Sequence, residues 1–238
     1  MLDTLLFDLD GTLLPFVQAD FNDAYFAGIS AFVSPLGYDG EQVIRGLWEG
    51  IYAMLRNDGS RLNRDVFWDG FIRVLGDGAR ELESVLDDFY TGPYDCVRAV
   101  QREQRELSGL MAQLREKGYT LVLATNPVFP AVAVAGRMAW VGLKPSDFDY
   151  VTSYENSGHC KPDPAYYRDI LARIGREPQS CMMIGNNPGD DGAAREAGLS
   201  IRILTDYLEN ERNLPLEDYP HSSFAKVCED LLALPSVK

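Results

Sequence analysis

Two aspartates stand two residues apart directly after the first apolar run of the chain, and their type and spacing suit a reactive site. The run Leu5–Phe7 leads to Asp8 and Asp10, and Gly11 and Thr12 then form a turn. Short apolar runs closed by a turn are typical of buried parallel strands, and ligands of open α/β sheets bind just beyond the carboxyl ends of such strands. One carboxylate there can attack a phosphoryl group, while a second can transfer protons. Taken alone, the pair is equally consistent with a solvated strand end or a turn cap.

Three later stretches place further polar groups after apolar runs. Thr125 and Asn126 follow "YTLVLA", Lys161 lies in "HCKPDP", and residues 185–191, "GNNPGDD", follow "CMMI". Taken singly, a lysine is usually a solvated surface group and a threonine often caps a helix. In a parallel sheet, however, all strands point their carboxyl ends the same way, so these stretches are expected to meet in one crevice.

The elements that must position these groups alternate between strand and helix patterns. Strands are predicted over residues 5–7, 119–125, 149–153, 181–185 and 199–204. Helices are predicted over residues 97–117, 128–143, 163–175, 191–198 and 226–235. This alternation predicts an α/β protein with a Rossmann-like parallel sheet covered on both faces.

Residues from about 20 to 90 have a different pattern, with four helical periodicities and no convincing strand. We therefore predict a helical cap domain at residues 16–94, inserted into an α/β core domain formed by residues 1–15 and 95–238. The insertion is rich in aromatic residues, and most of them are expected to form the core of a helical bundle rather than to contact a substrate.

On these four motifs and their order, the chain resembles the haloacid dehalogenase superfamily of hydrolases. "DLDGT" matches the first motif of that family, Thr125 the second, Lys161 the third and "GNNPGDD" the acidic fourth. The resemblance covers residues 1–15 and 95–238, whereas the insertion resembles the helical (C1) cap only in position and helical character.

The resemblance implies a role for each matched residue. Asp8 is implied as the nucleophile that forms an aspartyl-phosphate, and Asp10 as the general acid and base. Thr125, Asn126 and Lys161 are implied to hold the phosphoryl oxygens. The cofactor implied is Mg²⁺, which prefers oxygen ligands. Its implied ligands are Asp8, the Asp10 carbonyl, Asn186, Asp190 and Asp191.

The fourth motif departs from the family pattern at Asn186, where the first acid usually stands. An amide oxygen can bind a hard cation but brings no charge. We therefore expect weaker Mg²⁺ binding than is usual in the family, or partial compensation by Asp190 beside Asp191. The alternative is that Asn186 and Asn187 are only turn residues.

The function expected from this resemblance is Mg²⁺-dependent hydrolysis of the phosphate monoester of a small metabolite. Aspartate at position 10 indicates phosphatase or phosphomutase chemistry rather than dehalogenation. A phosphomutase and, because of Asn186, a weakly catalytic or non-catalytic binding protein stay open as alternatives. His159 and His221 are given no catalytic role. Seven residues in or next to the insertion are candidates for substrate selection: Phe16, Gln18, Asp20, Arg45, Trp48, Tyr52 and Arg56.

Composition narrows the possible partners. Lys and Arg total 22 against 36 Asp and Glu, which gives a net charge of −14. A field of that sign repels nucleic acid and anionic lipid, so neither nucleic acid nor a membrane is expected as a partner. The cysteines are scattered without metal-site spacing and are expected to be reduced, and the N-terminus lacks the pattern of a signal peptide. These features favour a cytoplasmic protein, while its oligomeric state does not follow from the sequence.

Overall fold

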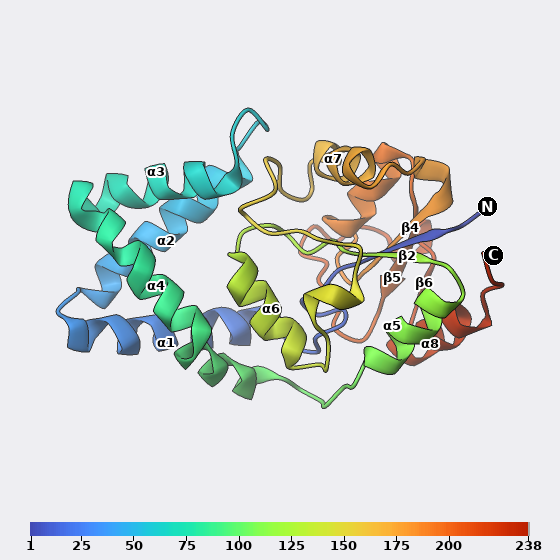
Figure 1. The fold of residues 1–238 in the computed structure, drawn as a ribbon, viewed down its shortest axis with the longest axis horizontal. Coiled ribbons are helices and arrows are strands. Elements are labelled where there is room, and N and C mark those ends of the chain that lie inside the picture. Colours follow the sequence, from blue (N-terminus) through green and yellow to red (C-terminus); the bar gives the residue numbers. More distant parts are fainter. Residues whose placement is uncertain (238) are drawn as a thin grey trace.

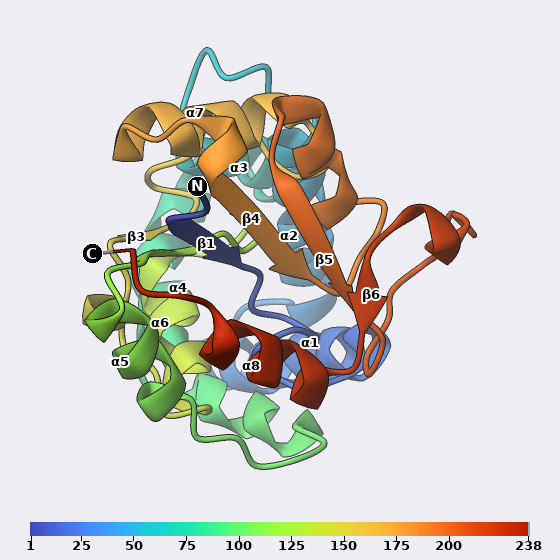
Figure 2. The ribbon, with the colours of Figure 1, turned by 90° about the vertical axis from the view of Figure 1, so that its right-hand side faces the viewer.

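Six parallel strands form one sheet in the computed structural model, which describes residues 1–237 (Figures 1 and 2). The strand order is β3-β2-β1-β4-β5-β6, so β1 lies near the centre. The strands are β1 (Thr4–Phe7), β2 (Thr120–Leu123), β3 (Tyr150–Val151), β4 (Cys181–Gly185), β5 (Ser200–Leu204) and β6 (His221–Ser222). This arrangement confirms the predicted α/β class and the parallel sheet. It places the ends of β1, β2 and β4 side by side.

Helices cover both faces of the sheet, as its alternating side chains require. Leu5 and Phe7 of β1 join one buried cluster, whereas Leu6 joins the cluster of the opposite face. The first face packs against α5 (Ser108–Glu116), α6 (Ala131–Ala139) and α8 (Phe224–Ala233). The second packs against α7 (Pro164–Ile174) and the 3₁₀ helix Asp191–Ala197.

Local sequence explains where α7 begins and ends. The Asp163 carboxylate accepts a hydrogen bond from the Ala165 N–H, and Pro164 occupies the first turn, where a missing N–H is harmless. Gly175 ends the helix in the left-handed conformation, with φ of 64°. The helix predicted from "DPAYYRDILARIG" is therefore confirmed, and it holds Lys161 just ahead of its N-terminus.

The chain between β1 and β2 forms the predicted helical insertion. Its helices are α1 (Gln18–Val33), α2 (Gly40–Leu55), α3 (Asn63–Leu75) and α4 (Leu82–Thr91). They lie beyond the carboxyl end of the sheet (Figure 1). The position and helical character of the insertion agree with a C1-type cap, while the domain boundaries at residues 15/16 and 94/95 stay predictions.

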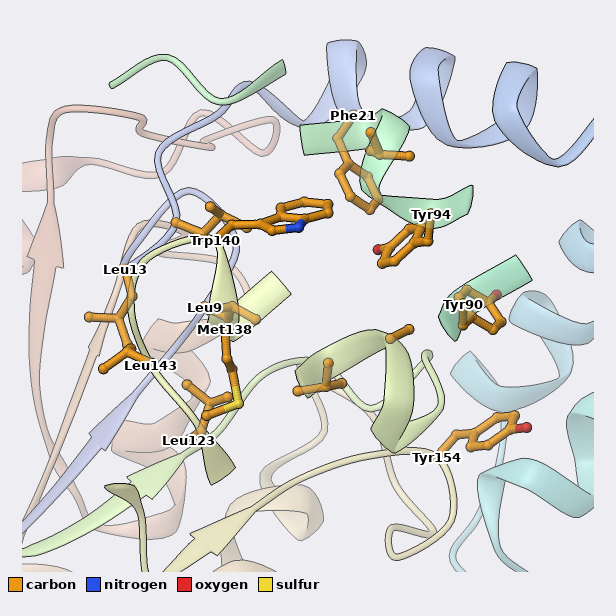
Figure 3. Packing of buried hydrophobic residues seen from close by; sticks show 14 of the residues in the cluster. Leu9, Leu13, Phe21, Tyr90, Tyr94, Leu123, Met138, Trp140, Leu143 and Tyr154 are labelled. Atoms are coloured by element: carbon orange, nitrogen blue, oxygen red, sulfur yellow. The ribbon is translucent and has the colours of Figure 1, made fainter. Parts of the chain in front are cut away.

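One continuous hydrophobic cluster joins the insertion to the core. It contains Leu9 and Met138 of the core together with Phe21, Tyr90 and Tyr94 of the insertion and its return segment (Figure 3). The expectation that most aromatic residues of the insertion form its packing core is confirmed at seven positions: Phe21, Tyr25, Phe67, Trp68, Phe71, Phe89 and Tyr90. Apolar contacts therefore hold the cap against the core domain.

The helix predicted over residues 97–117 is wrong in its first half. A 3₁₀ helix spans Pro93–Val100, residues 101–107 are irregular, and α5 begins only at Ser108. Tertiary contacts replace the helical hydrogen bonds in this segment. The Arg102 N–H donates to the Pro15 carbonyl at 2.8 Å, and Arg105 donates to the Thr12 carbonyl at 2.7 Å. These bonds tie the return segment to the loop that follows β1.

One further prediction needs correction in the last third of the chain. The helix expected after β4 is present as a 3₁₀ helix over Asp191–Ala197, but β5 is not the last strand, because one more short strand, β6, follows it. The Ile203 N–H donates to the Pro220 carbonyl and so brings β6 to the sheet edge after a long loop. No helix within residues 1–237 is long and apolar enough to cross a membrane.

Candidate active site

Residues from three of the predicted motifs meet at the carboxyl end of the sheet. The Asp8 N–H donates to the Ile184 carbonyl of β4 at 2.9 Å, which fixes the end of β1. Lys161 Nζ lies 2.8 Å from Asp8 Oδ1 and 2.7 Å from Asp191 Oδ1. All three side chains are buried. One ammonium group therefore bridges the predicted nucleophile and an acid of the fourth motif.

The positive charge of Lys161 does not neutralise the negative charges of the carboxylates around it. Burial raises the pKa of Asp8, and although Lys161 opposes this, the carboxylates of Asp191 and Asp10 contribute to a value of about 7. Burial disfavours the charge of Lys161, but Asp191 and Asp8 outweigh it and hold the lysine pKa well above its usual value. The cluster is therefore more negative than one lysine can neutralise, and a bound cation would stabilise it.

Asp10 faces a cation that the sequence analysis missed. Its Oδ1 atom lies 3.2 Å from Nε of Arg137, a fully buried residue of α6. The pair is an ion contact without good hydrogen-bond geometry. Arg137 also donates to the Tyr94 hydroxyl at 2.8 Å and lies over the Phe129 ring. Burial raises the pKa of Asp10 and Arg137 lowers it, so the net direction is upward, as a general acid requires.

The second motif is joined to the Lys161 loop by its backbone and by an amide side chain. Thr125 is buried, and its carbonyl accepts hydrogen bonds from Thr152 and Tyr166. Asn126 Oδ1 accepts from the Lys161 N–H at 3.2 Å. This bond gives Asn126 a positioning contact with the lysine loop, while its predicted contact with substrate stays a prediction.

Asn186 is buried and uses both ends of its amide within the protein. Oδ1 accepts from the Thr12 hydroxyl at 3.2 Å, and Nδ2 donates to the Tyr207 carbonyl at 2.6 Å. Gly11 makes room for it: a Cβ at Gly11 would lie 2.1 Å from Asn186 Nδ2, and its φ of 71° also favours glycine. The amide therefore joins the turn after β1 to the loop after β5, a contact that an ionised aspartate cannot copy.

The two acids of the fourth motif have different surroundings. Asp191 accepts from Lys161 with one carboxylate oxygen and from the Asn187 N–H with the other. Asp190 is half-buried, and burial together with Asp191 raises its pKa. Asp191 is thus committed to positioning the lysine, and Asp190 remains the less constrained of the two.

A cleft of about 320 Å³ brings the predicted site residues together. All eight line it: Asp8, Asp10, Thr125, Asn126, Lys161, Asn186, Asp190 and Asp191. The other walls come from Gln18, Val128, Phe129 and the loop residues 209–212. Sequence distance between the motifs therefore does not prevent a common site.

The cap contributes less to this cleft than the sequence analysis expected. Of the seven candidate selectors, Gln18 alone is among the residues that line the cleft. Phe16 is buried against Phe21, Asp20 pairs with Arg102, and Trp48 stacks on Tyr52. The selector role of these residues stays a prediction, whereas the loop 209–212 supplies a wall that sequence reasoning did not consider.

Glu209 is the second functional candidate that was missed. Its Oε1 atom is buried, and no hydrogen-bond partner for it is present in the described chain. Burial first and then the carboxylates of Asp8, Asp10 and Asp191 raise the Glu209 pKa to about 8, although the nearby side-chain amide of Asn187 lowers it. Its position within the charged run "YLENER" gave no motif or periodicity that could have identified it.

The oxygen donors in the cleft suit a hard divalent cation. Across residues 1–237, no three acidic, histidine or cysteine side chains are already grouped as a metal centre. Mg²⁺ usually takes only one or two carboxylates and completes its shell with water and substrate phosphate. Glu209 Oε1, which makes no hydrogen bond of good geometry within the described residues, and the surplus negative charge of the cleft fit such an ion.

Comparison with known proteins gives the family. The sequence pattern of haloacid dehalogenase-like hydrolases matches residues 2–198. The chain belongs to this family. Hydrolase chemistry is therefore shown, and the fold and the order of the motifs agree with it.

Relatives within the haloacid dehalogenase-like family include phosphatases. Pyrophosphatase PpaX of Bacillus velezensis is 23% identical over 237 residues, covering 98% of this chain and 96% of that protein. Phosphoglycolate phosphatase of Aquifex aeolicus is 23% identical over 215 residues, covering 89% of each. The structure of L-2-haloacid dehalogenase from Xanthobacter autotrophicus superposes with a TM-score of 0.57 at 16% identity, covering 98% of this chain and 100% of that one. The last comparison shows the fold alone, which supports more than one reaction.

Proposed function

We propose that this protein hydrolyses the phosphate monoester of a small metabolite through an aspartyl-phosphate on Asp8. The observation that carries the proposal is the pair Asp8 and Asp10 in one cleft, each beside its own cation. Lys161 contacts Asp8, and Arg137 contacts Asp10. A nucleophile and a separate proton carrier are the two groups that monoester hydrolysis by this route requires.

The residues divide the reaction into two steps. In the first, an Asp8 oxygen attacks phosphorus, the bond from phosphorus to the ester oxygen breaks, and Asp10 gives its proton to the departing alcohol. In the second, Asp10 takes a proton from water while the water oxygen attacks phosphorus. The bond from phosphorus to Asp8 then breaks, which releases phosphate and restores both carboxyl groups.

The surrounding groups hold the charge that develops on the phosphoryl oxygens. Lys161 and the Thr125 hydroxyl are proposed to bind these oxygens, because both line the cleft beside Asp8. Mg²⁺ would be held by Asp8, the Asp10 carbonyl and the segment 186–191, and it would neutralise negative charge on the nucleophile and the substrate. The closed hydrophobic contact between cap and core favours a substrate that fits within the cleft of about 320 Å³.

The test uses an aryl phosphate and then a panel of phosphorylated metabolites, each with Mg²⁺. We expect phosphate release by the wild-type protein and none above background by Asp8→Asn. Isomerised sugar phosphate with little free phosphate would indicate a phosphomutase. No turnover of any compound would overturn the proposed hydrolysis and favour a binding protein.

A further inference from the structure

Position 186, at the end of β4, carries an amide instead of an acid, so any further acid for a metal ion in the cleft has to come from another element. Asn186 is tied at both ends, to Thr12 and to the Tyr207 carbonyl. Its own carbonyl accepts a third bond, from the Glu209 N–H at 3.0 Å. One residue thus fixes the loop after β5 at two points, Tyr207 and Glu209. Asn186, which lacks the expected negative charge, therefore anchors the loop that carries the negative charge of Glu209.

Glu209 points its carboxylate to the same cleft as the catalytic acids. The residue lines the cleft together with Asp8, Asp10 and Asp191, and its Oε1 atom is buried. Asp8 and Asp191 both contact Lys161, and Asp10 contacts Arg137. Glu209 Oε1, by contrast, makes no hydrogen bond of good geometry within residues 1–237, and the neutral side-chain amide of Asn187 is close enough to lower the Glu209 pKa. A buried carboxylate oxygen without a donor is costly unless a cation or ordered water meets it.

The charges around Glu209 favour the binding of a cation. Glu209 shares the cleft with the carboxylates of Asp8, Asp10 and Asp191, and like charges within one cleft repel one another. A divalent ion placed among these groups would remove the repulsion between them. The same argument does not hold for Glu211, which also lines the cleft but is exposed.

We propose that Glu209 supplies, for a divalent cation in this cleft, the carboxylate that position 186 lacks. The acid would then come from the loop after β5 instead of from the end of β4, and Asn186 holds that loop in place. This inference rests on the proposed function for the presence of the cation, but it concerns binding and can be measured without turnover.

The experiment measures Mn²⁺ binding to the substrate-free, metal-depleted full chain by electron paramagnetic resonance of the free ion, with Mg²⁺ as competitor. Glu209→Gln keeps the shape of the side chain and removes its charge. We expect its dissociation constant to rise at least tenfold. Glu211→Gln is the matched control, because it removes the same charge two residues away, and its constant should stay within twofold of wild type.

Two further variants separate the possible outcomes. Asp8→Asn should also weaken Mn²⁺ binding, because Asp8 is a proposed ligand. Asp190→Asn tests the other acid that was expected to compensate for Asn186. Normal binding by Glu209→Gln together with tenfold weaker binding by Asp190→Asn would overturn the inference in favour of Asp190. Equal weakening by Glu209→Gln and Glu211→Gln would overturn it too, since only the general field of the cleft would then matter.

Failure of this inference is distinguishable from failure of the proposed function. If Glu209→Gln binds Mn²⁺ like wild type while Asp8→Asn abolishes phosphate release, the hydrolase stands and the role of Glu209 is wrong. If Glu209→Gln loses Mn²⁺ but no phosphate ester is turned over, the metal site stands and the reaction is wrong. Near-ultraviolet and far-ultraviolet circular dichroism of each variant shows that the fold is retained.

Discussion

The two walls of the cleft differ in how far the protein satisfies its own charges. On the lysine wall, formed by Asp8, Lys161 and Asp191, each charged side chain contacts a partner of opposite sign. On the loop wall, formed by Asn186 and residues 207–212, the backbone is tied firmly but Glu209 keeps an unpartnered oxygen. The difference indicates that the lysine wall is preorganised for chemistry, whereas a cation bound at the loop wall would stabilise it.

The largest loss of stability is expected when the lysine of the lysine wall is removed. Lys161→Met leaves Asp8 and Asp191 buried without their shared cation. At pH 8 we expect the free energy of unfolding to fall by about 3–5 kcal/mol, the cost of breaking a buried ion pair. Urea unfolding measures this loss. Lys144→Met removes an exposed lysine and should change stability by less than about 0.5 kcal/mol. A loss below about 1 kcal/mol for Lys161→Met would contradict the proposed preorganisation.

A substitution in the loop wall should lower stability less, because it removes one hydrogen bond to the backbone of the loop. Asn186→Asp replaces the N–H donor that meets the Tyr207 carbonyl with a carboxylate oxygen. We expect unfolding to become easier by about 1–3 kcal/mol, because one buried acceptor loses its donor and faces a like partial charge. The exposed Asn213→Asp makes the same chemical change in the same loop and should be nearly neutral. Unchanged stability of Asn186→Asp would show that the tether is not needed to hold the loop.

A pH dependence of stability separates the metal-free from the metal-loaded protein. The folded-state pKa is raised to about 7 for Asp8 and to about 8 for Glu209, above the unfolded values of these acids. The folded state therefore binds protons more tightly than the unfolded state, and stability falls as pH rises from about 4 to 8. Thermal unfolding without divalent ions should show a higher melting temperature at pH 5.5 than at pH 8.5.

Added Mg²⁺ sharpens the same comparison. It should raise the melting temperature more at pH 8.5 than at pH 5.5, because protons compete with the ion for the carboxylates. Glu209→Gln should flatten the metal-free pH dependence near pH 8. A metal-free protein that becomes more stable from pH 5.5 to 8.5 would refute the idea of an unsatisfied loop wall.

The lysine wall and Asn186 could be predicted from sequence, whereas the loop residues 207–212 could not. Apolar runs fix the strands, parallel strands share one end, and so Asp8, Lys161 and Asp191 had to meet whatever their distance along the chain. Glu209 and Arg137 carry no such signal. Glu209 reaches the cleft through hydrogen bonds to Asn186 over an irregular loop, and Arg137 looks like an ordinary polar residue in a helix until packing buries it.

The error in the return segment has the same origin. Residues 101–107 have helical composition, but Arg102 and Arg105 find partners in the carbonyls of Pro15 and Thr12. Arg105 also lies 3.7 Å over the Phe224 ring of α8. Local propensity is worth only tenths of a kcal/mol per residue, so such tertiary contacts override it. Hydrophobic periodicity correctly located the helices and strands that bury an apolar face. It failed for the segment 101–107, which is held by single long-range hydrogen bonds.

The central claim is that Asp8 carries the phosphoryl group during turnover. The most direct measurement mixes Asp10→Asn with an aryl phosphate, whose good leaving group does not need the acid, quenches the reaction with acid, and maps the phosphoryl label by mass spectrometry. Because Asp10 is also needed to activate water, we predict that the label accumulates on Asp8 and is removed by hydroxylamine. Turnover with no label on Asp8, together with phosphate release by Asp8→Asn, would contradict the account.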